Sequence, residues 1–290
     1  MTRAQPPGHV AKSSSAWTDA DLSLCNLKIV DTDVPTFFGI DRLPAPSISP
    51  AVLNMKATHS QQPMQTQIAL TNEERLFFQH LQAASTPSPD QETAVRDFTA
   101  HLLHLLGYTE PKPSAQHSEQ ASDEPRVIKK DYDLPLFMCG RTVHALADVC
   151  LLVPDMEHHH SDTVLLIAKA SRTGSSPTTD DTAAGVEARL IAQAIAAYQS
   201  QNRTRGRARL SPTEKHTVPG LIMAGTMPVL YKIEISGELA ECVQTAQVPT
   251  TTTKVQRLIM PGEGPAREGM IRLENRKVML GCLEAFKALI

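Results

Sequence analysis

The sequence predicts an α/β fold in which helices flank a mixed β-sheet. Helical periodicity dominates residues 71–107, and three strand-like runs follow within residues 126–172. A long helical run then precedes two more strands and a C-terminal amphipathic helix. Strands that follow one another directly, with helices before and after them, are typical of a layered domain around a mixed sheet.

Composition and charge restrict the class of protein. Apolar residues make up 41% of the 290 residues, and the net charge of −3 argues against a uniformly basic surface that coats nucleic acid. No apolar run reaches the roughly 20 residues of a membrane helix, and residues 1–17 lack the apolar centre of a signal peptide. The sequence therefore predicts a soluble intracellular protein, cytoplasmic or nuclear, with no membrane partner.

The five cysteines show neither a CxxC pair nor a zinc-binding spacing. Cys139, Cys150 and Cys282 lie in apolar runs, which predicts small buried side chains in a reducing compartment. Neither the segment around Cys25 nor that around Cys282 places a base beside the thiol, so the sequence does not support nucleophilic cysteine chemistry.

The N-terminal quarter is rich in proline and small polar residues. We expect residues 1–26 to form a disordered tail. Residues 27–70 begin with strand character through Ile40 and continue as proline-punctuated polar sequence, so we expect an extended arm that packs on the core. The domain itself is predicted to span residues 71–290, with a polar loop near residues 110–125.

Within this domain, each element has its own local signal. Thr71 and Glu74 form a capping-box pattern at the start of a short helix. Apolar residues at helical spacing from Val95 to Leu106 predict a second helix that ends at Gly107. The later elements are predicted as strands at 126–140, 141–153 and 163–172, a helix at 180–203, two strands within 216–236 around a Met227–Pro228 turn, a short helix at 237–247, an edge strand at 253–260 and a final helix within 268–290.

Asp148 and Lys169 are the central candidates for a functional site. Asp148 lies in the apolar run "ALADVCLL", where an unpaired carboxylate would cost on the order of several kcal/mol. Lys169, between two alanines on the next strand, is a natural partner. Many metal-dependent nucleases present an Asp and a Lys on adjacent strands in this way. The alternatives are a structural ion pair or a strand end that is open to solvent.

Two further groups are candidates. Glu92 lies near the apolar edge of its helix and either leans over the same site or remains solvated in the first turn, where the helix dipole favours it. The stretch "NRTRGRARL" after the long helix is predicted to be a loop that either contacts phosphates or carries solvated charges. Its arginines are Arg203, Arg205, Arg207 and Arg209.

Several phrases in combination resemble an uncharacterised family of mushroom-forming fungi, over nearly the whole chain from about Leu27. Among them are "VPTFFG", "DFTAHLLHLLGY", "VPGLIMAGTMPVLYKIEIS" and "EGMIRLENRKVMLGCLEAFK". That family is in turn similar to the PD-(D/E)xK restriction-endonuclease-like superfamily, whose core has the order helix, three strands, helix, strand. The resemblance implies a restriction-endonuclease-like mixed sheet flanked by helices.

In that superfamily a helix Glu, a strand Asp and an acid-x-Lys motif bind Mg²⁺ and position water for phosphodiester cleavage. By this resemblance Asp148 matches the strand Asp and Glu92 the helix Glu, while the acid-x-Lys position falls on Lys169-Ala170-Ser171. A lysine at a metal-ligand position opposes Mg²⁺. Glu187 on the long helix is the one candidate for a migrated acid at the metal.

We therefore expect a nuclease-like domain that has lost catalysis and needs no cofactor. It would bind nucleic acid through the arginine loop, or bind an unidentified protein. One alternative is an active Mg²⁺-dependent DNA nuclease that uses Asp148, Glu92 and a relocated acid, with Lys169 in the lysine role. The other is a purely structural or interaction protein.

Overall fold

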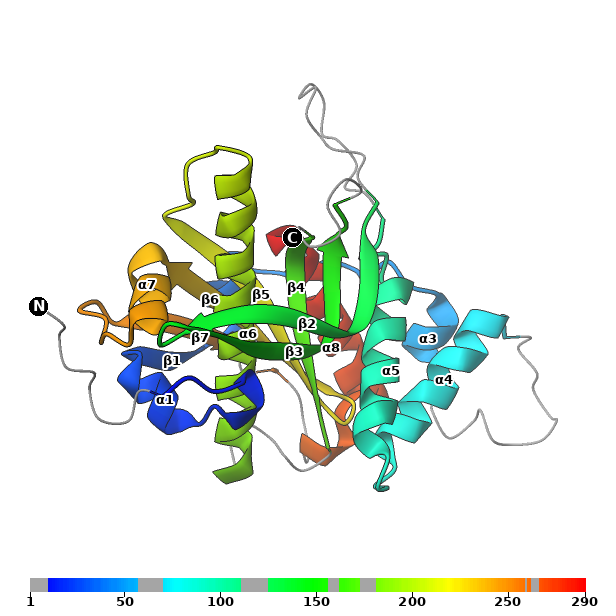
Figure 1. Cartoon of the computed structure of the whole chain (residues 1–290). Coiled ribbons are helices and arrows are strands. Elements are labelled where there is room, and N and C mark those ends of the chain that lie inside the picture. Colours follow the sequence, from blue (N-terminus) through cyan, green and yellow to red (C-terminus); the bar gives the residue numbers. More distant parts are fainter. Residues whose placement is uncertain are drawn as a thin grey trace, which may run out of the picture.

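The computed structural model describes residues 10–56, 70–110, 125–155, 162–172, 181–258, 260–261 and 266–290. A seven-stranded sheet with the order β1-β7-β6-β5-β4-β3-β2 lies between two layers of helices (Figure 1). The pairs β1–β7 and β4–β5 are parallel and the other neighbours are antiparallel. The α/β class with a mixed sheet, predicted from the sequence, is confirmed.

The elements follow the predicted order closely. The strands are β1 (Leu27–Thr32), β2 (Val127–Met138), β3 (Arg141–Val153), β4 (Thr163–Ser171), β5 (Lys215–Ala224), β6 (Met227–Ser236) and β7 (Thr253–Leu258). The helices are α1 (Asp19–Leu24), α2 (Val34–Phe38), α3 (Pro50–Asn54), α4 (Asn72–Ser85), α5 (Gln91–Leu105), α6 (Asp181–Arg207), α7 (Gly237–Thr245) and α8 (Leu273–Phe286). Short 3₁₀ helices lie at Ser14–Ala16, Ala266–Ile271 and Lys287–Leu289.

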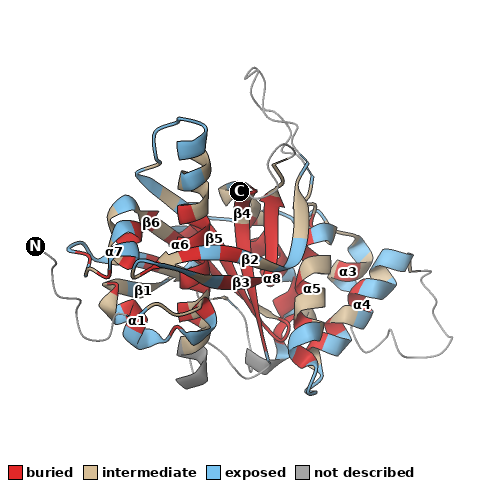
Figure 2. Cartoon of the chain, viewed as in Figure 1, coloured by how far each residue is buried: buried red, intermediate tan, exposed pale blue. Residues whose placement is uncertain are grey.

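The sheet separates two apolar cores. On one face, α6 packs with α1 and α7, and the small residues of α6 allow close approach to the strands. On the other face, α4, α5 and α8 bury aromatic and leucine side chains. Figure 2 shows buried residues on the central strands between these layers. The sheet and its covering helices thus form one packed unit around the region of Asp148.

The predicted caps of the first two long helices are confirmed. Thr71 and Glu74 form the capping box of α4, in which the Glu74 carboxylate accepts a hydrogen bond from the Thr71 N–H at 2.7 Å. Gly107, one residue after the C-cap of α5, has a φ of +73°. This left-handed conformation favours glycine, which explains why the helix ends there.

Residues 10–26 are folded, so the predicted disordered tail is wrong for this part; residues 1–9 lie outside the described residues. Trp17 is 1% exposed and packs with Leu22 and Cys25 in the core beneath α6. A buried indole removes a large apolar area from water, which compensates for the polar composition around it. The composition of the segment therefore predicted its state poorly.

Residues 27–56 contribute a strand and two short helices instead of a wholly extended arm. β1 pairs in parallel with β7, from Leu27 opposite Thr253 onward. β7 is therefore internal, and the predicted edge position belongs to β1. The strand character predicted through Ile40 ends earlier, because Asp33 caps α2 by accepting a hydrogen bond from the Thr36 N–H. Residues 57–69, the rest of the predicted arm, lie outside the described residues.

Two smaller predictions also need correction. The β5–β6 turn consists of Gly225 and Thr226, and the predicted Met–Pro pair instead begins β6. Among the cysteines predicted to be buried, Cys150 and Cys282 are buried, but Cys139 is only half-buried. The predicted polar loop near residues 110–125 lies almost entirely outside the described residues.

The β2–β3 hairpin bends near its middle and crosses α6 (Figure 1). Asp131 has a φ of +53°, and the position where it lies opposite Asp148 is unpaired in an otherwise unshifted antiparallel register. On β3, Ala147 belongs to the core beneath α6 and Val149 to the opposite core, so the strand changes face at Asp148. The bend therefore places Asp148 where the hairpin leaves the sheet.

Within the described part of the chain, no helix combines the length and the apolar character that a membrane crossing requires.

Candidate functional site

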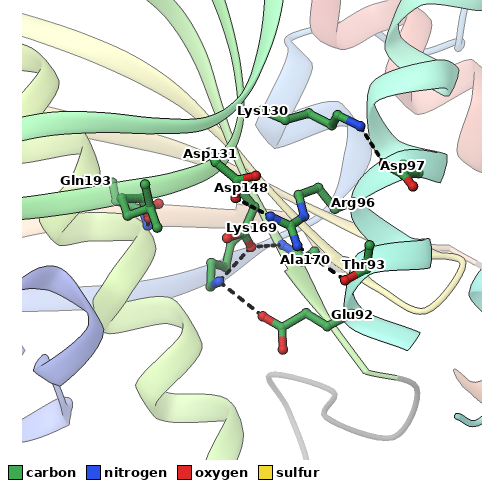
Figure 3. Close-up of polar contacts among 11 residues, drawn as sticks. Glu92, Thr93, Arg96, Asp97, Lys130, Asp131, Asp148, Lys169, Ala170 and Gln193 are labelled. Atoms are coloured by element: carbon green, nitrogen blue, oxygen red, sulfur yellow. Dashed lines mark hydrogen bonds and ion pairs between the residues drawn. The ribbon is translucent and has the colours of Figure 1, made fainter. Parts of the chain in front are cut away.

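Asp148 of β3 and Lys169 of β4 form a buried ion pair (Figure 3). Asp148 Oδ2 lies 2.6 Å from Lys169 Nζ, and the Ala170 N–H donates to the same oxygen with an N···O distance of 2.7 Å. The two residues are 8% and 9% exposed. The contact predicted between these side chains is confirmed.

The strand register explains why the pair forms. The β3–β4 ladder ends where Val149 lies opposite Ala168, which brings Asp148 beside Lys169. Beyond this point β3 bends away, so the Ala170 N–H has no neighbouring β3 carbonyl to bond. The Asp148 carboxylate accepts that hydrogen bond instead, and a buried backbone donor is satisfied. Asp148 therefore has a structural role that does not depend on any ligand.

Glu92 joins the same site from the first turn of α5. Its Oε1 lies 3.5 Å from Lys169 Nζ, and its side chain is 51% exposed. In Figure 3 the ammonium group lies between the two carboxylates. Three residues predicted from the sequence are therefore brought together by three different elements, with Glu92 on the side that is open to solvent.

A row of ion pairs continues along α5 beside this site (Figure 3). Arg96 pairs with Asp131, the residue at the bend of β2. Asp97 Oδ1 accepts a hydrogen bond from Lys130 Nζ at 2.8 Å. These contacts were not predictable from the sequence, because helical and strand periodicity do not reveal which charged faces meet. Such exposed pairs contribute little to stability, but they align α5 over the bend.

Gln193 of α6 lies on the other side of the bent hairpin (Figure 3). Its Nε2 donates to the Leu146 carbonyl at 2.6 Å, which attaches α6 to β3 just before Asp148. Its Oε1 is buried and has no hydrogen-bond partner among the described residues. Gln193 is therefore a positioning contact for the strand segment that carries Asp148.

The residues at this site do not fit a Mg²⁺ ion as they are arranged. Oδ2 of Asp148 already accepts from an ammonium and an amide, and a cation separates it from Glu92. Across the described ranges, no group of three His, Cys, Asp or Glu side chains is placed to hold a metal. If Lys169 is taken as the lysine of acid-x-Lys, the acid position falls on Ile167, which is completely buried in the core.

Glu187, the candidate for a migrated acid, does not join the site. Its Oε1 accepts hydrogen bonds from the Tyr231 hydroxyl at 2.6 Å and from Arg257 Nη1 at 2.9 Å. Burial raises the pKa of Glu187, although both hydrogen bonds oppose this effect. The side chain thus links α6 to β6 and β7, and its assignment as a metal ligand is not supported by its position.

The predicted arginine loop is largely helical, which corrects the sequence expectation. α6 continues to Arg207, so Arg203, Arg205 and Arg207 lie on its last turns and only Arg209 follows it. The Arg203 guanidinium lies over the Phe137 ring, 4.0 Å from its centroid. Arg205 Nε donates to the Ser211 carbonyl at 2.9 Å. Packing of the helix end against β2 extends α6 beyond the predicted boundary.

Comparison with known proteins gives no identification. No model of a known protein family matches the chain, and no curated protein matches it. The order of α5, β2, β3, β4, α6 and β5 is nevertheless the order helix, three strands, helix, strand that the resemblance implies. Family membership remains a prediction.

Proposed function

We propose that this protein is a nucleic-acid-binding module built on a nuclease-like fold, in which an ion pair has replaced metal-dependent catalysis. The observation that carries this proposal is the 2.6 Å contact between Lys169 Nζ and Asp148 Oδ2 at the point where β3 leaves the sheet. The element order and the convergence of Glu92 on the same point support the relationship to a nuclease site.

The ion pair explains how the fold tolerates the loss of a metal. A buried carboxylate requires a counter-charge, because removal from water strongly disfavours the ionised form. In a metal-dependent enzyme the ion supplies that charge. Here the Lys169 ammonium supplies it from within the chain, and the Ala170 N–H completes the hydrogen bonding of Asp148 Oδ2. The arrangement preserves the shape of the site, and the Lys169 ammonium occupies the place next to Asp148 that a metal cation would need.

A local cluster of positive charge supports nucleic acid as the partner. The C-terminal turns of α6 present three arginines, and Arg209 follows directly. The chain as a whole carries a net charge of −3, so any phosphate contact must be local instead of a general attraction. Arginine is suited to this role because its planar guanidinium bonds two phosphate oxygens at once.

One observation favours an active Mg²⁺-dependent nuclease as a second candidate. Asp148 and Glu92 both face the same ammonium group, so that a change in the position of Lys169 would bring two carboxylates to one open point. The present arrangement does not fit the metal, and we therefore place this candidate second.

Calorimetric titration of Mg²⁺ and Mn²⁺, together with a nuclease assay on labelled DNA, tests the proposal. We expect no metal binding and no cleavage by the wild type or by Asp148→Asn. We also expect salt-dependent binding of DNA or RNA by the wild type, because phosphate contacts release counterions. Cleavage that disappears in Asp148→Asn would establish the enzyme instead. The absence of any salt-dependent binding would favour a protein partner.

A further inference from the structure

A cavity of about 270 Å³ lies between β2 and the C-terminal half of α6. It is separate from the Asp148 site, because its walls come from β2, from Asp162 just before β4 and from the last turns of α6. Most of its described lining is polar or charged. It therefore differs from a defect in packing, which would be lined by apolar side chains.

One face of α6 lines this cavity with a regular pattern of donors. Ser200, Arg203, Thr204 and Arg207 all contribute to the wall, and their spacing of three, four and seven residues places them on the same side of a helix. The face thus combines two hydroxyl groups with two guanidinium groups. Arg205 lies between these positions and is not part of the lining.

The charges around the cavity leave the two arginines free to bind an anion. Asp162 is buried and accepts hydrogen bonds from Lys129 Nζ at 2.9 Å and from the Tyr132 hydroxyl at 3.0 Å, so Lys129 is neutralised. Asp133, the other acid in the lining, lies 2.6 Å from a ring nitrogen of His144. Neither lining arginine has a carboxylate partner within the described part of the chain.

Arg203 is also held in place before any ligand binds. Its guanidinium lies 4.0 Å from the centroid of the Phe137 ring, which restricts the side chain without using its hydrogen-bond donors. A guanidinium that is ordered by stacking loses less conformational freedom when it binds an anion. The Arg203–Phe137 pair therefore favours recognition of a planar or tetrahedral oxyanion.

We propose that this cavity is a phosphate-binding pocket in which Arg203 and Arg207 contact a phosphate group. The hydroxyls of Ser200 and Thr204 supply additional donors from the same helix face. Assignment of that phosphate to a nucleic-acid backbone rests on the proposed function. Free phosphate presents the same chemistry, and the experiment below distinguishes the two sources.

The helix dipole gives the simplest alternative explanation of these arginines. The C-terminal end of a helix carries partial negative charge, which cations stabilise and which disfavours a bound anion. That effect depends on distance from the helix end and not on which face an arginine occupies. The pocket requires Arg203 and Arg207 specifically. The dipole effect alone would give Arg205 and Arg209 a contribution similar to that of Arg203 and Arg207.

This difference provides a matched pair of variants with equal loss of charge. The test variant combines Arg203→Gln with Arg207→Gln, and the control combines Arg205→Gln with Arg209→Gln. Binding of a labelled 20-base-pair DNA duplex is measured by fluorescence anisotropy over a range of salt concentrations. Binding of inorganic phosphate is measured by calorimetry, and circular dichroism verifies that both variants remain folded.

We expect the test variant to lose about tenfold or more in duplex affinity, and its salt dependence to fall by about 0.9 in slope for each contact removed. We expect the control to change much less and to retain phosphate binding. Equal losses in both variants, or an unchanged test variant, would overturn the pocket while leaving salt-dependent DNA binding intact. If only the test variant loses phosphate binding, and the wild type does not bind the duplex, the pocket would be supported and the nucleic-acid function refuted. Failure of the wild type to bind either probe would overturn both.

Discussion

Asp148 Oδ2 and Lys169 Nζ lie 2.6 Å apart at the point where β3 separates from β4. The same carboxylate oxygen accepts the Ala170 N–H, so the ion pair also closes the end of a β-ladder. The stability of the fold and the proposed loss of metal-dependent catalysis therefore depend on the same atoms. Measurements on these residues must separate the cost of an unpaired buried charge from a loss of function.

A double-mutant cycle on this pair is the first prediction. Asp148→Ala leaves a buried ammonium whose one remaining ion-pair partner among the described residues is the half-exposed Glu92, and we expect a loss of about 3–5 kcal/mol in the free energy of unfolding. Combining Asp148→Ala with Lys169→Met should recover much of this loss, since the unpaired charge is removed. Urea denaturation measures each value.

The exposed Lys130–Asp97 pair is the control for that cycle. Its side chains are 51% and 36% exposed, and Lys130→Met should change the free energy of unfolding by less than about 1 kcal/mol. If Asp148→Ala proved equally mild, Asp148 would not be the tightly paired buried charge that its contacts indicate.

Arg276 is predicted to be essential for stability, although no carboxylate among the described residues forms an ion pair with it. It is completely buried and donates to the carbonyls of Met270 at 2.7 Å, Val52 at 2.9 Å and Met55 at 2.7 Å. Burial lowers its pKa to about 10, so the side chain remains charged at neutral pH. Arg276→Met removes these donors and should cost about 3–5 kcal/mol.

Guanidinium denaturation of Arg276→Met measures this effect. Arg272→Met is a suitable comparison, because Arg272 lies on the preceding turn with a side chain that is 34% exposed. We expect that variant to remain close to the wild type. Similar stabilities for both variants would mean that the buried carbonyls find other donors.

Histidines between α4 and α5 are predicted to make the protein less stable in acid. The His80 and His101 rings lie 5.2 Å apart, and burial lowers the pKa of both. Because the folded pKa values lie below the unfolded value of roughly 6.5, the unfolded chain binds more protons in that interval. Stability should therefore fall as pH decreases from about 6.5 toward the folded pKa values.

His101→Gln should reduce this pH dependence, and thermal melts between about pH 5 and pH 7.5 would show it. His104→Gln serves as the control, since His104 lies one turn further along α5 and is exposed. An identical pH profile for the wild type and His101→Gln would exclude the histidine pair as the cause.

Cysteine reactivity provides a prediction about packing. Burial raises the pKa of Cys25 and of Cys282 to about 12, and in Cys25 the nearby Asp21 adds to the effect. Thiolates are the reactive form, so both residues should resist iodoacetamide at pH 7.5 until the protein unfolds. The half-buried Cys139 and Cys242 should react before them, as mass spectrometry of timed samples can establish. Early labelling of Cys25 would show that residues 10–26 detach readily.

Local sequence signals were sufficient wherever neighbouring residues decide the structure. The capping box at Thr71, the left-handed position at Gly107 and the apolar spacing of α5 depend on contacts within a few residues. The pairing of Asp148 with Lys169 was also accessible, since consecutive antiparallel strands bring nearby parts of the chain together.

Predictions failed where the contacts are distant in sequence. Trp17 orders a polar segment by entering a core formed mainly by later residues, and composition alone cannot show this. The last turns of α6 form a helix because they pack on β2. The arginines predicted to lie in a loop are therefore mostly on a helix, where their spacing places Arg203 and Arg207 on one face. In both cases tertiary packing outweighed the local preference.

The sequence by itself determined the α/β class, the order of the elements from α4 to α8 and the identity of the Asp148–Lys169 pair. Only the tertiary structure decided that Glu187 accepts hydrogen bonds from Tyr231 and Arg257. It also decided that β1 pairs with β7, through contacts between residues 226 positions apart in the sequence. The physical reason is that hydrophobic periodicity records which face of an element is buried, but not which distant element buries it.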